Sequence, residues 1–494
     1  MKSKILFYGL LFITFQIFGQ ELLFDKDIEL KSIFGDNRNS LPILNKDKNE
    51  LALFLLDRKQ INSLIFNDKY EYIDHYSTNR PEENFDDLIG YSIDLKGYHL
   101  IFTNSTKNQF FIKSIDFSLK SDQGKELSIN LKDEKYLESI SYKNNFYLLT
   151  LKKKSSILKI YEISSNEIKN IKEFDFSLYR FSNSDNSTLY DLLIRKFEPF
   201  KSVSVIQKID NNNPNPLDIT TNSCKIYYYN DKFYLTLDNN IYNTWLITIN
   251  LDDYTSAVKY FGQTKINSIE GAFEIKSNSF LFEDYLYQIM GSKVELSLQI
   301  KSLRKDSVIK EFRVNEKEEI DFRNTALFQK GGTIVPGDYE RELGKTKQIL
   351  RKISSSKIGV SVSHYHDDLA LTVGGIKEVT STGGYMMTGS GSTISTPQGS
   401  ISLPPTYHYN PTMYSYNTYT NTRSVYFKTV LEKNGFNHIE KDITKKEAFD
   451  KIKNYEDNND VDMTCKTVFK VDEYYVFGYY KKWDKKYYLR KFTD

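Results

Sequence analysis

The 494-residue sequence predicts a mainly β fold, and two observations carry that prediction. Aromatic residues are abundant, with 37 Tyr and 33 Phe, and aromatic side chains favour the half-buried surfaces of pleated sheets. Short strands joined by tight polar turns recur along most of the chain, and the segment Tyr227–Leu237 (YYYNDKFYLTL) is an example. With 39% hydrophobic and 27% charged residues, the chain has the composition of an ordered globular protein.

The first 19 residues are predicted to be a secretory signal peptide. Lys2 and Lys4 precede the uncharged apolar run Ile5–Phe18, and the small residue Gly19 provides a cleavage point before Gln20. The apolar run is shorter than the ~20 residues that a membrane-spanning helix needs, and no later segment is long and apolar enough to cross a bilayer. The segment ends in FGQ and resembles the signal peptides of Bacteroidota-type bacteria. We therefore expect export to the periplasm, the cell surface or the exterior.

The predicted mature chain carries no net charge. The full chain has 67 Lys and Arg against 65 Asp and Glu, and removing residues 1–19 removes two lysines and no acidic residue. A neutral chain offers no overall electrostatic attraction for nucleic acid or for an anionic membrane, so no nucleic-acid partner is predicted. Cys224 and Cys465 are the only cysteines. They cannot build a disulfide framework, and one disulfide or two buried thiols both stay open.

The strand–turn–strand pattern repeats at a regular interval. Five clear copies have their predicted turns at Lys96-Gly97, Asn144-Asn145, Asp231-Lys232, Asn278-Ser279 and Asp472-Glu473. Four further copies place turns at Asn49-Glu50, Ser187-Thr188, Asn324-Thr325 and Asp367-Asp368. From residue 49 to residue 367 the spacing stays near 45 residues, and it then jumps to 105. Asn and Asp suit such turns because they tolerate positive φ.

Four short strands per ~45 residues are typical of a propeller blade. On this repeat the chain resembles the β-propeller superfamily, without the WD or kelch signatures of particular families. The resemblance implies about seven or eight four-stranded blades around a central axis. Nine candidate hairpins exceed a typical ring, so one or two are expected to be false or to share a blade where the ring closes. Residues 20–379 are assigned to the blades and residues 466–494 to the closing strands.

Residues 380–465 interrupt the repeat and are predicted to form an insertion. The insertion begins with a Gly/Ser/Thr-rich loop and then continues with two helices. The first helix is expected over Ser424–Asn434, and the second begins at a capping box formed by Thr444 and Glu447. A further helix is expected around Tyr339–Ile353. A small separate α+β domain over residues 380–465 is the alternative.

Tyrosines of the insertion are the predicted binding residues. An exposed tyrosine offers a flat apolar ring with a polar tip, which suits both sugars and protein partners. The alternative is that these side chains pack the insertion onto the ring. The set comprises Tyr407, Tyr409, Tyr414, Tyr416 and Tyr419.

One histidine-rich stretch, SHYHDD, requires a decision between a metal site and a turn. His364, His366 and Asp368 match by position the H-x-H-x-D-H motif of the metallo-β-lactamase fold, but Leu369 stands where that family has its last histidine. Overlaid on Tyr227–Leu237, the same stretch reads as a strand that ends in a hairpin turn. We therefore predict a turn and no metal site, while a metal held with partners from elsewhere stays open.

No complete catalytic constellation is visible. The sequence has no nucleophile elbow, P-loop, dinucleotide fingerprint or HExxH motif, so no cofactor is predicted and the prediction leans away from an enzyme. The signal peptide and the repeat favour a non-catalytic binding or scaffolding protein of the bacterial envelope or exterior that recognises a protein or a glycan. A glycan- or polymer-active hydrolase or lyase is the alternative. A metal-dependent hydrolase using His364 and His366 ranks after it.

Overall fold

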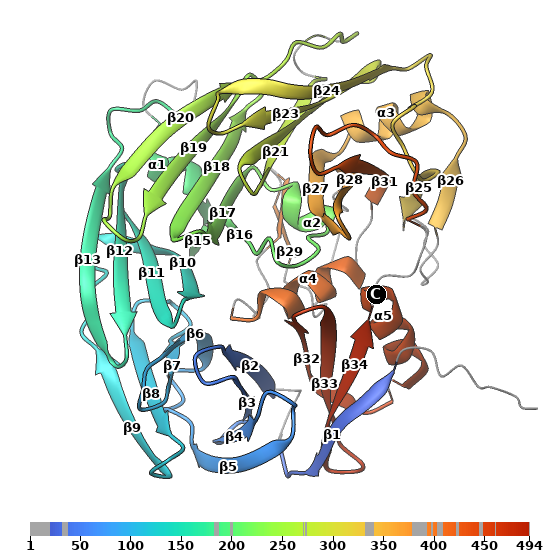
Figure 1. The fold of residues 1–494 in the computed structure, drawn as a ribbon. Helices are drawn as coiled ribbons and strands as arrows, with labels where there is room; N and C mark the ends of the chain where they lie inside the picture. The colour runs from blue at the N-terminus through green and yellow to red at the C-terminus, as the bar shows by residue number, and fades with distance from the viewer. Residues whose placement is uncertain are drawn as a thin grey trace, which may run out of the picture.

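The computed structural model describes the chain from residue 20 to residue 493 with internal gaps: residues 20–31, 38–181, 187–197, 201–269, 271, 274–330, 340–377, 393–396, 399–402, 409–420, 424–443, 448–459 and 461–493. Within these residues, seven sheets of four or five strands follow one another around a ring (Figure 1). The fold is mainly β and has the arrangement of a seven-bladed propeller, as the repeat predicts. The predicted signal peptide, residues 1–19, lies outside the described residues.

The first three sheets each contain four antiparallel strands in chain order. Their strands are β2 (Asn39–Asn45), β3 (Glu50–Leu56), β4 (Gln60–Phe66) and β5 (Tyr72–Asn79); β6 (Asp87–Ile93), β7 (Tyr98–Thr103), β8 (Phe110–Asp116) and β9 (Ser121–Leu127); and β10 (Glu134–Tyr142), β11 (Asn145–Lys152), β12 (Ile157–Ser164) and β13 (Glu167–Asp175).

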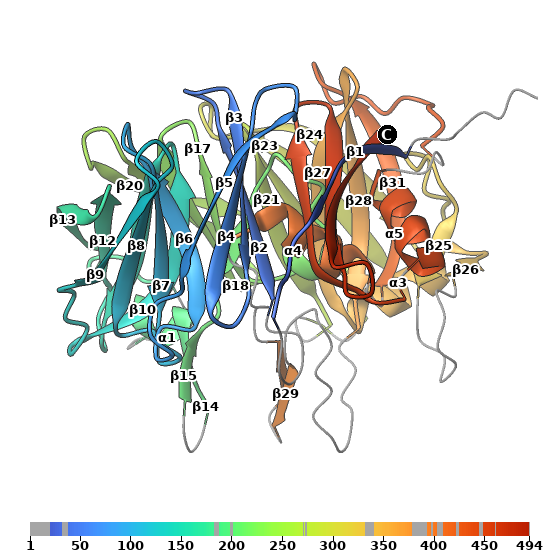
Figure 2. The same ribbon diagram turned by 90° about the horizontal axis from the view of Figure 1, so that it is seen from below.

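Of the next three sheets, the fourth and the sixth contain five strands and the fifth contains four. Their members are β16 (Gln207–Ile209), β17 (Cys224–Tyr229), β18 (Lys232–Asn240), β19 (Asn243–Asn250) and β20 (Ser256–Gly262); β21 (Lys276–Phe282), β22 (Tyr285–Gly291), β23 (Glu295–Ser302) and β24 (Ser307–Asn315); and β27 (Lys357–Tyr365), β28 (Asp368–Ile376), β31 (Ser424–Glu432), β25 (Leu327–Lys330) and β26 (Glu340–Leu343). The short strand β16 pairs parallel to β17 on the side of the axis. Two hairpins, β14 (Ile194–Phe197) with β15 (Lys201–Ser204) and β29 (Thr393–Thr396) with β30 (Gly399–Ser402), project from one face of the ring (Figure 2).

The seventh sheet joins the two ends of the chain. It contains β32 (Met463–Val471), β33 (Tyr474–Lys481) and β34 (Lys486–Thr493), and the N-terminal strand β1 (Glu21–Asp27) pairs antiparallel with β34. Because this sheet takes its outermost strand from the start of the chain, the pairing closes the ring. The closing sheet therefore contains more than the predicted residues 466–494. Strand β32 already begins at Met463, and β1 from the start of the chain is the fourth strand.

Six of the nine predicted hairpins are present, each in a different sheet. At Lys143-Asn144 and Asn230-Asp231 both turn residues have positive φ, as a type I′ turn requires. These two turns lie one residue earlier than predicted, as does the turn at His366-Asp367. The turn at Asp472-Glu473 is confirmed.

Three turn predictions were wrong. Asn278 and Ser279 lie inside β21, and the chain turns at Glu283-Asp284 instead. Thr188 forms the N-cap and capping box of helix α1 (Leu189–Leu193) and belongs to no hairpin. Asn324 lies in a loop, where its side chain accepts a hydrogen bond from the Val430 N–H and donates one to the Ile439 carbonyl. Polar residues mark tight turns only when their side chains are not used for such caps and internal contacts.

The first predicted helix of the insertion, Ser424–Asn434, was also wrong. This segment is strand β31, which pairs with β28 and β25 in the sixth sheet. Phe427, Val430 and Leu431 fit a helical spacing, but Val425, Phe427 and Leu431 alternate along a strand, and all three are buried. Burial between two strands decides in favour of the extended form.

Helices occupy the junction between the sixth and seventh sheets. Helix α4 (Pro411–Thr420) contacts β32, and α5 (Ala448–Asn459) contacts β33 and β34 (Figure 1). The predicted apolar face of α5, Phe449, Ile452 and Tyr455, is buried. Thr444 and Glu447 of the predicted capping box lie outside the described residues. The helix predicted around Tyr339–Ile353 is shorter, since residues 340–343 form β26 and α3 spans Thr346–Ser354.

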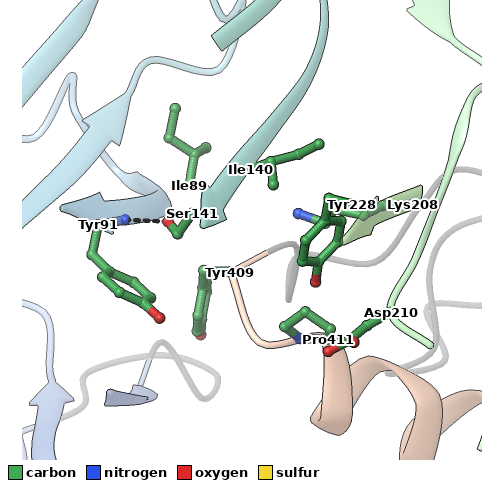
Figure 3. A pocket seen from close by; sticks show the side chains of 9 residues that line it. All are labelled: Ile89, Tyr91, Ile140, Ser141, Lys208, Asp210, Tyr228, Tyr409 and Pro411. Carbon is green, nitrogen blue, oxygen red and sulfur yellow. Dashed lines mark hydrogen bonds between the residues drawn. The ribbon is translucent and has the colours of Figure 1, made fainter. Parts of the chain in front are cut away.

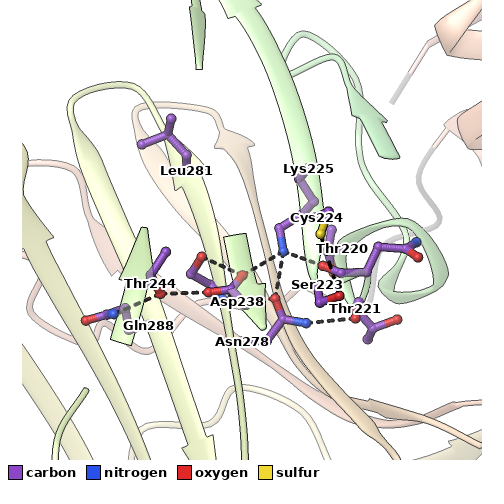
Figure 4. A network of polar contacts seen from close by, with 12 residues as sticks. Thr220, Thr221, Ser223, Cys224, Lys225, Asp238, Thr244, Asn278, Leu281 and Gln288 are labelled. Carbon is purple, nitrogen blue, oxygen red and sulfur yellow. Dashed lines mark hydrogen bonds and ion pairs between the residues drawn. The ribbon is translucent and has the colours of Figure 1, made fainter. Parts of the chain in front are cut away.

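A buried polar network links the fourth, fifth and sixth sheets (Figure 4). The Lys225 amino group donates to Asp238, to the Asn278 side-chain oxygen and to the Asn222 carbonyl. The Asn278 amide nitrogen in turn donates to the carbonyls of Thr221 and Ile358. All three ammonium donors of Lys225 are used, so the buried charge is fully compensated. The network explains why Asn278 lies in a strand.

Cys224 and Cys465 are both buried, and neither forms a disulfide. In the described part of the chain, no helix is long and apolar enough to cross a membrane.

Candidate binding cavity on the ring axis

A cavity of about 170 Å³ lies near the ring axis, between inner strands of three consecutive sheets and two segments that reach into the centre. Strands β6, β10, β16 and β17 supply lining residues, and so do the residue after β16 and the chain that enters α4 (Figure 3). The lining residues are Ile89, Tyr91, Ile140, Ser141, Lys208, Asp210, Tyr228, Tyr409 and Pro411.

The close approach of β6 to β10 shapes one wall. Ile89 and Tyr91 both line the cavity from β6, whose pairing with β7 shifts register at Ile89. Gly90 between them allows this approach, because a Cβ there would lie only 2.6 Å from the Phe146 ring. The Tyr91 N–H donates to the Ser141 hydroxyl at 2.8 Å, which ties the two sheets together at the cavity. The wall is therefore apolar at Ile89 and Ile140 and polar at Ser141.

Lys208 brings a buried ammonium group to the cavity. Its Nζ donates to the Ser139 carbonyl at 2.8 Å and lies 3.6 Å from Glu138 Oε1. The side chains of Lys208 and Glu138 are 10% and 4% exposed. Burial lowers the pKa of the Lys208 amino group, and the Glu138 carboxylate opposes that shift. The pair places a compensated positive charge beside a pocket that can take a ligand.

Asp210 brings a carboxyl group to the same cavity. It accepts hydrogen bonds from the backbone and side-chain nitrogens of Asn212 at 3.0 and 2.9 Å and from the Asn213 side chain at 2.9 Å. These donors favour the charged form, but burial outweighs them and raises the pKa of Asp210. A carboxyl group with a raised pKa facing a cavity is a candidate for proton donation or for hydrogen bonding to a ligand.

Three tyrosines provide the aromatic part of the lining. Figure 3 shows Tyr91, Tyr409 and Tyr228 with their hydroxyl groups directed to the same side of the cavity. Burial raises the pKa of Tyr91 to about 12, and the negative charge of Asp210 adds to the effect. Burial likewise raises the pKa of Tyr228 well above its ordinary value. Tyr91 and Tyr228 therefore stay neutral hydroxyl groups at physiological pH and can donate or accept hydrogen bonds.

The predicted binding tyrosines of the insertion have different positions. Tyr407 lies outside the described residues. Tyr409 is 6% exposed and lines the cavity. The Tyr414 hydroxyl donates to Gln207 at 2.9 Å, and the Tyr419 hydroxyl to Asp450 at 2.6 Å. Tyr416 is 1% exposed and packs against Phe449 with ring centroids 5.5 Å apart. Of the four described residues, only Tyr409 reaches the cavity, and the other three pack α4 against its neighbours.

The histidine stretch forms the end of a hairpin. His364 Nε2 lies 3.3 Å from Glu283 Oε1, and its ring packs against Phe282. His366 is a turn residue with φ of 54°, and Asp368 forms an ion pair with Lys441. The side chains that match the metal-binding motif thus have different partners. Among the residues that the structure describes, no group of three or more His, Cys, Asp or Glu side chains is arranged to hold a metal ion.

Sequence reasoning missed Tyr91, Lys208, Asp210 and Tyr228. Tyr228 lies in the clearest hairpin copy, where it reads as an ordinary strand residue. The one available signal was the stretch Asp210–Pro216, DNNNPNP, which is rich in turn-forming residues and does not fit the repeat. It marks the loop that carries Asp210 toward the axis.

Comparisons with known proteins support no family assignment. Neither a protein-family model nor a curated protein matches the chain. Solved structures with distant likeness include an apocarotenoid oxygenase from Synechocystis, at 7% identity and a TM-score of 0.28 over 58% of this chain and 64% of that one. A prolyl endopeptidase matches at 8% identity and 0.30, over 90% and 46%. The dihydro-heme d1 dehydrogenase NirN matches at 7% and 0.28, over 58% and 50%. This chain spans less than two thirds of the length of each.

Proposed function

We propose that this protein is an exported binding protein that holds a glycan residue in the axial cavity. One observation carries the proposal: three tyrosines, a lysine and a carboxyl group from separate parts of the chain line the same cavity. A sugar presents apolar C–H faces and a periphery of hydroxyl groups. Aromatic rings complement the former, and tyrosine hydroxyl, ammonium and carboxyl groups complement the latter.

The size of the cavity favours a small ligand over a protein surface. Its volume of about 170 Å³ is below the ~300–1,000 Å³ of pockets for drug-sized ligands. A protein–protein interface buries a broad patch, on the order of 800 Å² on each partner. The cavity therefore fits a single ring or the end of a chain, and a glycan partner is preferred to a protein partner at this site.

Calorimetric titration with a panel of neutral and acidic mono- and oligosaccharides tests the proposal. We expect Tyr228→Ala and Asp210→Asn each to weaken the binding of a sugar found in this way by roughly tenfold or more, as for buried contacts of other interfaces. Tyr260→Ala is the matched control, because Tyr260 is 64% exposed on β20, away from the cavity lining. Binding unchanged in both cavity variants, or no binding by any sugar of the panel, would overturn the proposal.

A second function, glycan cleavage, is favoured by the chemistry of Asp210. A carboxyl group whose pKa is raised by burial retains its proton at higher pH and can act as a general acid. The measurement is the release of new reducing or unsaturated chain ends from a glycan that binds. If the bound glycan stays intact over prolonged incubation, the protein is a binder only.

Export is part of the proposal and rests on the sequence of residues 1–19. The test is a fusion of residues 1–30 to a reporter that lacks its own signal, together with N-terminal sequencing of the secreted protein. Cleavage before Gln20 is the expected result, and a reporter that stays in the cytoplasm would contradict it.

A further inference from the structure

The turn between β33 and β34 presents the most exposed tryptophan of the described residues. Trp483 is 85% exposed at the tip of this hairpin, whereas large apolar side chains are usually buried. Val461, 82% exposed, precedes Asp462, whose carboxylate accepts a hydrogen bond from the Trp483 N–H at 3.0 Å. The Lys482 N–H donates to the Asp462 carbonyl. These two contacts hold the chain at Asp462 against the turn, and neither the Val461 nor the Trp483 side chain takes part in them.

Basic residues surround this tip. Lys481 and Lys482 precede Trp483, and Lys485 and Lys486 follow it within the sequence KKWDKK. The acidic groups nearby are engaged: Asp462 caps the turn, Asp484 accepts from the Tyr488 hydroxyl at 3.0 Å, and Asp25 pairs with Lys486 at 2.9 Å. Asp27 also lies opposite Lys486 in the β1–β34 pairing, so the two aspartates of β1 offset that lysine. At the turn itself Lys481, Lys482 and Lys485 stand against Asp462 and Asp484, which leaves a positive balance there although the predicted mature chain is neutral.

We propose that the β33–β34 tip docks on a membrane surface that contains anionic phospholipid. Tryptophan prefers the headgroup level of a bilayer, where its ring is apolar and its N–H can reach a polar partner. Lysines next to it are attracted by the negative surface potential. Trp483 and Val461 enter the interface, and the flanking lysines contact phosphate groups. The lysines favour this occupant, because an uncharged apolar partner would have no electrostatic attraction to Lys481, Lys482 and Lys485.

The position of the tip in the fold is compatible with docking. In each blade the turn between the second and third strands lies on the same face of the ring as the end of the fourth strand, where the chain leaves for the next blade. The β29–β30 hairpin is inserted between β28 and β31, the second and third strands of the sixth sheet, so the β33–β34 turn lies on the face from which it projects (Figure 2). The short two-residue hairpin turns lie on the opposite face. A membrane contact at the tip thus leaves the opposite face of the ring exposed to the surroundings.

The two tryptophans of the chain make the test direct. In a Trp245→Phe background, Trp483 is the only tryptophan, so its fluorescence reports its own environment. Vesicles of phosphatidylcholine with a quarter phosphatidylglycerol are compared with vesicles of phosphatidylcholine alone. We expect a blue shift and co-sedimentation with the anionic vesicles, both reduced by added salt. Absence of a shift and of co-sedimentation with anionic vesicles would overturn the proposal, as would equal binding to both kinds of vesicle.

Variants assign the contact to the tip. Trp483→Ala, and separately the triple change Lys481→Ser, Lys482→Ser and Lys485→Ser, are expected to weaken sedimentation with anionic vesicles by roughly tenfold or more. Leu178→Ala is the matched control, since Leu178 is 95% exposed in the turn after β13 and should have no effect. Circular dichroism checks that each variant is folded. Wild-type binding by a folded Trp483→Ala variant contradicts the assignment, even if a protein partner is later found at the tip.

Discussion

The Lys225 ammonium nitrogen lies 3.0 Å from Asp238 Oδ2, and neither side chain is appreciably exposed to solvent. Asp238 also accepts from the hydroxyl groups of Thr244 and Ser279, at 2.6 and 2.9 Å. Removing one member of such a pair leaves the other as an uncompensated buried charge. The network therefore links three sheets. Substitution of one charged member is expected to destabilise the fold, because the other charge then stays buried without a partner.

Lys225→Met is expected to lower the free energy of unfolding by about 3–5 kcal/mol, because Asp238 then stays buried without a counter-charge. Urea denaturation followed by circular dichroism measures the change. Arg304→Met serves as the control, since the Arg304–Asp284 pair is largely exposed and its loss should change stability little. Equal effects of the two substitutions would show that the network does not stabilise the ring.

Asp210→Asn is expected to reduce the loss of stability between acidic and neutral pH. Burial raises the folded-state pKa of Asp210 above its unfolded value, so the folded state binds the proton more tightly. Stability is then greatest below the unfolded pKa of ~3.9 and is lost as the pH rises through the folded pKa. The asparagine side chain does not titrate, so this loss of stability is absent in the variant. Unfolding measured at acidic and neutral pH, with the exposed Asp68→Asn as control, should show a smaller decrease toward neutral pH for Asp210→Asn.

Phe449→Ala is expected to destabilise the protein by about 3–5 kcal/mol, as for other buried aromatic residues. Phe449 contacts the rings of Tyr416, Tyr419 and Tyr475, with centroids 5.2–5.8 Å apart, and so joins both helices to the seventh sheet. Thermal unfolding measures the loss. Asn454→Ala at an exposed position of α5 is the control, and a comparable effect there would argue against a packing role for the helix.

Removal of residues 20–27 is expected to lower the melting temperature and to promote aggregation. The deletion removes β1, exposes the edge of β34 and takes Phe24 away from the Phe66 ring, 4.7 Å distant. Calorimetry and light scattering are the measurements. Phe24→Ala keeps the strand pairing, so a smaller loss of stability without aggregation is expected from it. A truncated chain as stable as the full one would show that the closure is dispensable.

The residue types at the turns predicted the hairpins well where the turn side chains are not used for helix caps or buried hydrogen bonds. Asn144 and Asp231 adopt positive φ, as tight turns require, and the aromatic residues that follow them enter buried strands. The same reasoning failed at Asn278, whose side chain is recruited into a buried network. It failed at residues 424–432 because helical and strand spacings both fit the apolar residues there. Only pairing with β28 and β25 distinguishes them, and residues 328–330 of β25 lie about a hundred positions earlier in the chain.

The sequence by itself determined the β class, the repeated hairpin and, through that repeat, a ring of about seven blades. These follow from local preferences: aromatic and β-branched residues in pleated strands, and Asn, Asp and Gly in turns. Only the tertiary structure decided the candidate site. Tyr91, Lys208 and Tyr409 belong to distant segments, and they meet because ring closure and α4 bring them to one axis. The raised pKa of Tyr91 and the lowered pKa of Lys208 arise from burial at that place, and burial depends on the whole fold.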